Sequence, residues 1–191
     1  PRSTLFPYTT LFRSGSDDGT SSGGYDEKDI NLTIAKLVGG YLEAEGAKVY
    51  YTRTSDTYVS LTDRTDYAYN KGCNLFVSIH CNSSSSSSAA GTEVYYSVKS
   101  AYAKKTLASK ISSAVSSALD TSNRGAKTKT GSSGNDYYSV IRTSAAKGIP
   151  GLIVEHGFMS NSSDLSKLTS SSYQKKAAKA EAEAIIKYWN S

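Results

Sequence analysis

The chain has 191 residues, of which 38% are hydrophobic and 20% are charged, a composition that suits one folded domain and excludes a disordered chain. Lysine and arginine outnumber aspartate and glutamate by 22 to 17, which gives a net charge of +5, but no dense basic run or nucleic-acid-binding motif accompanies the excess. No stretch approaches the ~18 apolar residues of a membrane span. We therefore expect neither a nucleic-acid partner nor a membrane span.

Residues 1–14, with the sequence PRSTLFPYTTLFRS, have no amphipathic period and no helix cap. The string resembles translated sequencing-adapter sequence, so we interpret it as a non-native leader and leave it out of the fold. The polar segment GSDDGTSSGGY follows, and it lacks the signature of a phosphate-binding loop. The folded domain is therefore expected to comprise residues 15–191.

Helical periodicity of apolar residues is clear in four places. Asp26 is expected to cap a helix that begins at Glu27 and ends at Gly46. Ser60 and Asp63 are typical caps for a second helix, 61–71. Two further helices are predicted at 104–119 and 172–189.

Apolar and β-branched runs predict the strands, which we expect at residues 48–53, 75–79, 92–97, 137–143 and 151–155. Residues 83–88 and 121–135 are expected to be loops. The run 75–79 is apolar on both faces, as in the middle of an α/β sheet. The pattern predicts an α/β fold: a single three-layer domain with a mostly parallel, twisted central sheet and helices on both faces.

Polar residues follow two of the predicted strands and begin the first helix. His80 follows the run 75–79, Glu155 ends the run 151–155, and Glu27 opens the helix. Ligands of open α/β sheets bind outside the carboxyl ends of strands. Each residue alone also has an ordinary explanation: a satisfied histidine, a salt-bridged carboxylate, or a complement to the helix dipole. His156 should point to the opposite face from Glu155 and be structural.

Five pieces of sequence occur in order: EKDINLTIAKLVGGYLEAEGAKVYYTR, LTDRTDYA, LFVSIHCNSS, GTEVYYS and IPGLIVEHGFMSN. Together they resemble the catalytic domain of the zinc-dependent N-acetylmuramoyl-L-alanine amidases, a family of bacterial autolysins. The resemblance implies one Zn²⁺ held by Glu27 and His80, with Glu155 as the catalytic glutamate and Asn82 as a substrate contact.

The same resemblance implies the substrate and the setting. The substrate would be peptidoglycan, both glycan strand and stem peptide, cut between N-acetylmuramic acid and L-alanine by zinc-activated water. We expect a secreted, monomeric hydrolase that acts at the cell wall.

The chain departs from the family pattern before Gly15. The family places its first zinc histidine in a G-H-G-G-like turn after the first strand, and counting back from Gly15 puts Arg13 at that position. We therefore expect the first strand to be missing or replaced, the domain to be truncated at its N-terminal side, and the chain as written to bind zinc weakly and be impaired.

Two other interpretations remain open. A wall-binding module without chemistry would have Arg13 as its genuine signature. Another zinc amidohydrolase or peptidase on the same fold would share the ligands.

Overall fold

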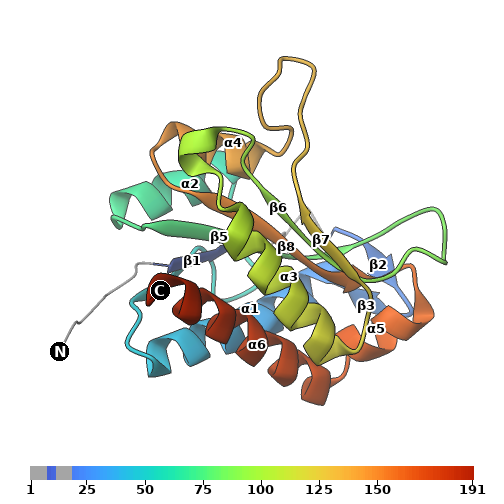
Figure 1. Cartoon of the computed structure of the whole chain (residues 1–191). Helices are drawn as coiled ribbons and strands as arrows, with labels where there is room; N and C mark the ends of the chain where they lie inside the picture. The colour runs from blue at the N-terminus through green and yellow to red at the C-terminus, as the bar shows by residue number, and fades with distance from the viewer. Residues whose placement is uncertain (1–7, 12–18) are drawn as a thin grey trace.

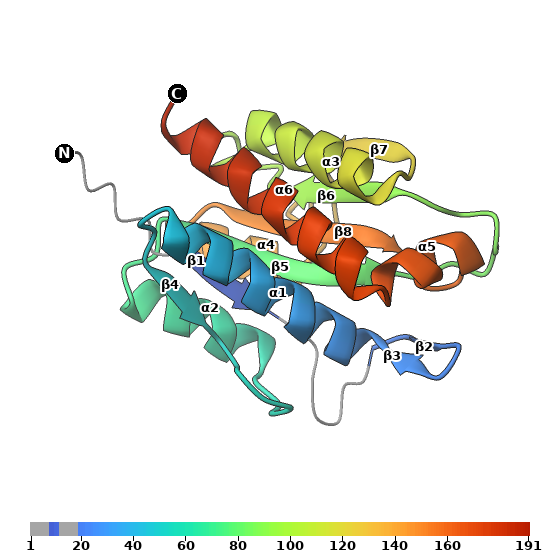
Figure 2. The same cartoon turned by 90° about the horizontal axis from the view of Figure 1, so that it is seen from below.

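A six-stranded sheet forms the centre of the molecule, and helices cover both of its faces (Figure 1, Figure 2). The computed structural model describes the backbone of residues 8–11 and the whole of residues 19–191. The strand order is β4-β1-β5-β8-β6-β7, and every neighbouring pair is parallel except β8 with β6. The predicted single domain with a mostly parallel sheet is confirmed. The strands of the sheet are β1 (Tyr8–Leu11), β4 (Val49–Tyr51), β5 (Leu75–Asn82), β6 (Thr92–Tyr96), β7 (Asn123–Lys127) and β8 (Gly151–Phe158).

Strand β1 lies between β4 and β5 and pairs in parallel with both. Its ladder with β5 runs from Tyr8 beside Leu75 to Leu11 beside Ser78. These residues belong to the segment that the sequence analysis left out of the fold, and for them that exclusion was wrong. The position expected for the first strand is thus filled by residues 8–11. Arg13 lies outside the described residues.

Three long helices cover one face of the sheet, and two shorter helices cover the other (Figure 2). The four helices expected from periodicity are present, and their bounds agree with the predictions to within two residues. Among the described residues, no helix is both long enough and apolar enough to cross a bilayer. The first face carries α1 (Glu27–Ala44), α3 (Lys105–Leu119) and α6 (Ser171–Trp189), and the second carries α2 (Leu61–Asn70) and α4 (Ser139–Ala146). The remaining short elements are the hairpin of β2 (Ser21–Ser22) and β3 (Tyr25–Asp26), a 3₁₀ turn (Ser100–Tyr102) and α5 (Ser162–Leu168).

The hydrophobic core is divided by the sheet into two clusters. Val77 and Ile79 of β5 pack on the side of α1, α3 and α6, together with Val154 of β8. Phe76 and Ile153 pack on the side of α2 and α4. Because side chains alternate along a strand, Ser78 and His80 of β5 and Glu155 of β8 point toward α2 and α4 as Phe76 and Ile153 do.

Two segments differ from the prediction. Residues 137–143 were expected to form a strand, but most of them belong to α4, whose residues Val140, Ile141 and Ala145 pack as one helical face. The aromatic and β-branched run suggested a strand, and tertiary packing overrode that propensity. Residues 123–127 were expected in a loop but form the edge strand β7. Their polar composition does not indicate a strand, and backbone pairing with β6 holds them in the sheet.

Helix ends follow the sequence at Ser60 and at Gly46, which has φ +86° just after the end of α1, but not at Asp26. Ser60 accepts a hydrogen bond from the backbone N–H of Asp63, as predicted for α2. Asp26 is the N-cap residue of α1, but its side chain makes no cap hydrogen bond and instead accepts from the Ser21 hydroxyl across the β2–β3 hairpin.

Gly39 and Gly40 of α1 offer a matched pair for testing the packing of this helix. A Cβ on Gly39 would meet the Tyr51 ring, with the hydroxyl oxygen at 1.9 Å, whereas a Cβ on Gly40 would meet no atom within 4 Å. We expect Gly39→Ala to lower the free energy of unfolding by about 1–3 kcal/mol through overpacking. Gly40→Ala should raise it by about 0.5–1 kcal/mol through helix propensity. Urea denaturation of the two variants checks this, and equal effects would contradict the packing described for β4 against α1.

Candidate active site

A row of three titratable side chains crosses the sheet on the face of α2 and α4. In the β5–β8 ladder His80 is paired with Glu155, and in the β8–β6 ladder Glu155 is paired with Glu93. Directly paired residues of neighbouring strands project to the same face of a sheet. The predicted residues His80 and Glu155 are therefore brought side by side. Their strands run on beyond them to Asn82 and Phe158, so neither residue is the last of its strand.

Glu27 reaches this row from the first turn of α1. The N-terminal end of α1, next to β3, lies at the edge of the sheet where β5 and β8 end (Figure 2). Glu27 is 4% exposed, and its Oε1 lies 2.9 Å from Nδ1 of His80. Asn31 Nδ2 and the backbone N–H of Cys81 also donate to Oε1, at 3.0 and 3.3 Å. Sequence positions 27 and 80 thus meet in one buried contact.

The environment of Glu27 favours its ionised form. Burial alone would raise its pKa, but the hydrogen bond and charge of His80 and the hydrogen bonds from Asn31 and Thr20 outweigh burial and bring the pKa to about 2. The N-terminus of a helix also favours a negative charge. Glu27 is therefore a carboxylate at any ordinary pH.

The imidazole of His80 is held at both nitrogens. Nδ1 faces Glu27, and Nε2 lies 2.6 Å from the hydroxyl oxygen of Ser78, which is two residues earlier on the same face of β5. Its side chain is 14% exposed. Ring orientation is therefore set by one neighbour on a helix and one on its own strand.

Glu155 is the carboxylate with the opposite behaviour. Its Oε2 is buried and has no hydrogen-bond partner among the described residues. Burial raises its pKa to about 7, the nearby charges of Glu27 and Glu93 act in the same direction, and His80 opposes them. A cavity of about 130 Å³ opens beside Glu155, and Arg64, Ser78 and Tyr138 contribute to its walls. Glu155 is thus a carboxylate poised to change its protonation state near neutral pH.

The other sequence-predicted residues have clear partners. Asn82 Nδ2 donates to Glu93 Oε1 at 3.0 Å, and its Oδ1 accepts from the N–H of Ser83. Its amide is therefore engaged within the protein, and a contact with substrate stays a prediction. His156 lies on the opposite face, fully buried, with Nε2 3.0 Å from Glu181 Oε2, as expected for a structural histidine.

Glu93 is the site residue that sequence reasoning missed. It is 2% exposed, and it interrupts the apolar strand TEVYY in the same way that Glu155 interrupts its own strand. That interruption was the available signal. Its partners Arg124 and Lys127 lie on β7, which carries no strand pattern, so the sequence offered no signal for them.

The described residues offer suitable types of donor atom for a metal ion but too few ligands. A carboxylate oxygen and an imidazole nitrogen that converge at one point are suitable zinc ligands. Catalytic zinc sites usually have three protein ligands, however, and the described residues contain no group of three or more His, Cys, Asp and Glu side chains that could hold a metal.

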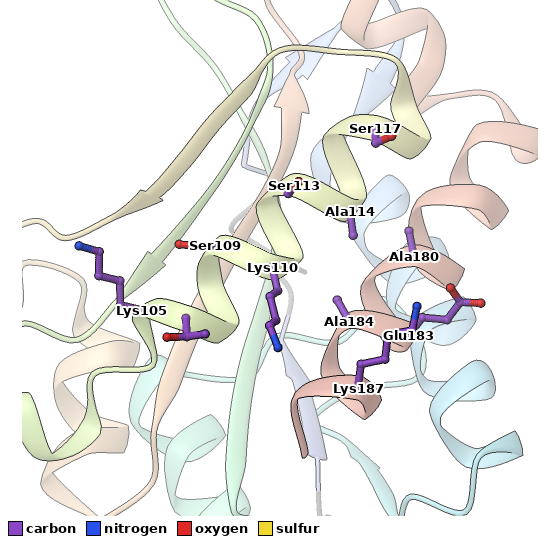
Figure 3. A pocket seen from close by; sticks show the side chains of 11 residues that line it. Lys105, Ser109, Lys110, Ser113, Ala114, Ser117, Ala180, Glu183, Ala184 and Lys187 are labelled. Carbon is purple, nitrogen blue, oxygen red and sulfur yellow. The ribbon is translucent and has the colours of Figure 1, made fainter. Parts of the chain in front are cut away.

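A larger cavity, of about 780 Å³, lies between α3 and α6 (Figure 3). Lysine, serine and alanine side chains line most of it, and Glu183 is the acidic residue among them. It belongs to helices on the other face of the sheet and is separate from the row of titratable side chains.

Comparison with known proteins points to one family. Residues 13–187 match the family profile described as N-acetylmuramoyl-L-alanine amidase. The amidase LytC of Bacillus subtilis is 37% identical over 174 residues, which are 91% of this chain and 33% of LytC, so the chain spans about a third of that relative. Among solved structures, Cwp6 of Clostridium difficile has a TM-score of 0.88 at 33% identity, over 96% of this chain and 29% of Cwp6. The N-acetylmuramoyl-L-alanine amidase of Clostridium difficile 630 has a TM-score of 0.87 at 30% identity, over 98% of this chain and 97% of that one. The chain therefore belongs to the N-acetylmuramoyl-L-alanine amidase family, as the sequence pieces around Glu27, His80 and Glu155 indicated.

Proposed function

We propose that this chain cleaves the amide bond between N-acetylmuramic acid and L-alanine in peptidoglycan, with Glu155 moving the protons. The observation that carries the proposal is the position of Glu155, which is paired with His80 and lines the same cavity. Amide hydrolysis needs a base that takes a proton from water and an acid that gives one to the leaving amine. A carboxyl group with a pKa of about 7 can do both near neutral pH.

We further propose that Glu27 and His80 hold Zn²⁺ in the complete site. When bound, the ion would acidify a water molecule and polarise the scissile carbonyl. The low pKa of Glu27 keeps a carboxylate ready as a ligand, and Ser78 restrains the other nitrogen of the His80 ring. Because the family's first histidine corresponds to Arg13, the chain as written is proposed to bind zinc weakly and to act slowly.

The setting follows from the same proposal. A monomeric enzyme would act outside the cell on the wall, where its net charge of +5 suits an anionic polymer. Residues 1–14 are proposed to be of non-native sequence, although residues 8–11 supply strand β1 of the sheet.

Glu155→Gln tests the role of the proposed acid and base. We expect release of new L-alanine amino groups from purified peptidoglycan to fall by at least about 100-fold, because the amide cannot accept a proton. The variant is made both in the chain as written and in an Arg13→His chain. Glu183→Gln, an exposed side chain on α6, is the matched control and should retain activity. Undiminished release by a folded Glu155→Gln variant would refute the assignment.

Metal analysis tests the incomplete ligand set. After dialysis against zinc, we expect much less than one zinc per chain as written, and a value close to one in the Arg13→His variant. The reason is that a third ligand completes a catalytic zinc site. Tight one-to-one zinc in the chain as written would contradict the proposed loss of the first ligand. Wall binding with no amine release from either chain would favour the binding module.

The pKa of Glu155 predicts a pH dependence of stability in the metal-free protein, measured with a chelator present. The folded state holds the proton up to about pH 7, whereas the unfolded chain loses it near the ordinary value of 4.5. As the pH rises between these values, wild type should therefore lose stability relative to Glu155→Gln. Urea denaturation at pH values from about 4 to about 8 measures the difference in free energy of unfolding between the two proteins. A difference that stays flat or changes in the other direction would show that Glu155 is ionised normally.

A further inference from the structure

Glu93, Arg124, Lys127, Tyr95 and Asn82 form a hydrogen-bonded cluster beside the proposed catalytic glutamate. Glu93 Oε2 accepts from Arg124 Nε at 2.6 Å and from Lys127 Nζ at 2.5 Å. Its Oε1 accepts from the Tyr95 hydroxyl at 2.8 Å and from Asn82 at 3.0 Å. Two cations share one buried carboxylate, so the cluster as a whole carries one excess positive charge.

The two cations are fixed in place and keep donors for another group. Arg124 uses Nε on Glu93 and Nη1 on the carbonyl oxygen of Ala90, and its guanidinium lies over the Phe158 ring at 4.8 Å. Among the described residues, no acceptor contacts Arg124 Nη2, and Lys127 Nζ has Glu93 as its hydrogen-bond partner. Their side chains are 35% and 33% exposed, so both are partly open to solvent.

The cluster lies on the same face of the sheet as Glu155. Glu93 is paired with Glu155 in the ladder, and Lys127 is paired with Tyr95, two residues along β6 from Glu93. Strand β7 is two strand spacings from β8, which is roughly 10 Å. A peptide advances about 3.5 Å per residue. A group within about three residues of the scissile amide could therefore reach the cations.

The chemistry of the substrate decides which part can be recognised there. In the glycan strand, the lactyl carboxyl of muramic acid is consumed in the amide, so that side of the scissile bond carries no charge. The stem peptide carries free carboxylates. Fixed arginine and lysine donors recognise carboxylates by charge-assisted hydrogen bonds.

We propose that Arg124 and Lys127, held by Glu93, form a subsite that binds a carboxylate of the stem peptide and sets the direction in which the substrate lies across Glu155. This rests on the proposed function. Glu93 is then a positioning residue, since it orients the two cations and does not itself meet the substrate.

A pair of substrates tests the subsite: N-acetylmuramoyl-L-alanyl-D-glutamate and the same compound with its glutamate carboxylates converted to carboxamides. In the Arg13→His chain, Lys127→Met should raise KM for the carboxylate substrate by about tenfold or more, with little change in kcat. Lys127→Met should leave KM for the carboxamide substrate unchanged. Lys127→Arg should retain the discrimination. Lys129→Met, which removes the same charge two residues away, is the matched control and should behave like wild type.

A binding measurement separates this inference from the proposed hydrolysis. The peptide L-alanyl-D-glutamate and its carboxamide form are titrated calorimetrically into the chain as written and into Lys127→Met. The subsite is supported if the chain as written binds the carboxylate peptide more tightly than the carboxamide peptide and Lys127→Met does not. This holds even if no amide is cleaved. Equal binding of the two peptides by wild type, or an equal loss in Lys129→Met, overturns it while leaving the hydrolase proposal intact.

Discussion

The contact between Glu27 and His80 is the interaction on which the site depends. It joins the first turn of α1 to β5, two elements that are 53 residues apart in the chain. A buried carboxylate is costly unless it is hydrogen-bonded, and here the imidazole, an asparagine and backbone N–H groups satisfy it. The same interactions bring its pKa to about 2. The start of α1 and the outer part of β5 are thereby held together, and the cavity beside Glu155 opens next to them.

Three neighbouring carboxylates fall into two classes according to their surroundings. Glu27 is stabilised as an anion by His80, and Glu93 by Arg124 and Lys127. Glu155 has no such partner on its buried Oε2, and its pKa is raised to about 7. Environments that push the pKa values of neighbouring acids apart are a general sign of separate chemical roles. The arrangement suits one permanent anion for a ligand position and one exchangeable proton for catalysis.

The sequence correctly predicted the helices and strands whose buried residues form a clear apolar pattern. Helices α1, α3 and α6 carry stripes at helical spacing, and β5 and β8 are nearly continuous apolar runs, so local pattern and tertiary burial agree. Strand β7 and helix α4 were predicted wrongly because packing against the sheet overrides their local composition. Strand β1 was set aside for its unusual composition, although its backbone completes the sheet between β4 and β5.

The residues alone indicated the family and the chemical types of the site: an imidazole after one apolar run, a carboxylate at the end of another, and a carboxylate at a helix start. These are recognisable because a charged side chain next to an apolar run is unusual and needs a partner. The partners of these side chains are set by the folded arrangement of the sheet. The ladder register places His80, Glu155 and Glu93 in one row, and the edge strand delivers Arg124 and Lys127 to Glu93. Register and strand order are set by the packing of the whole sheet, and no local stretch of residues encodes them.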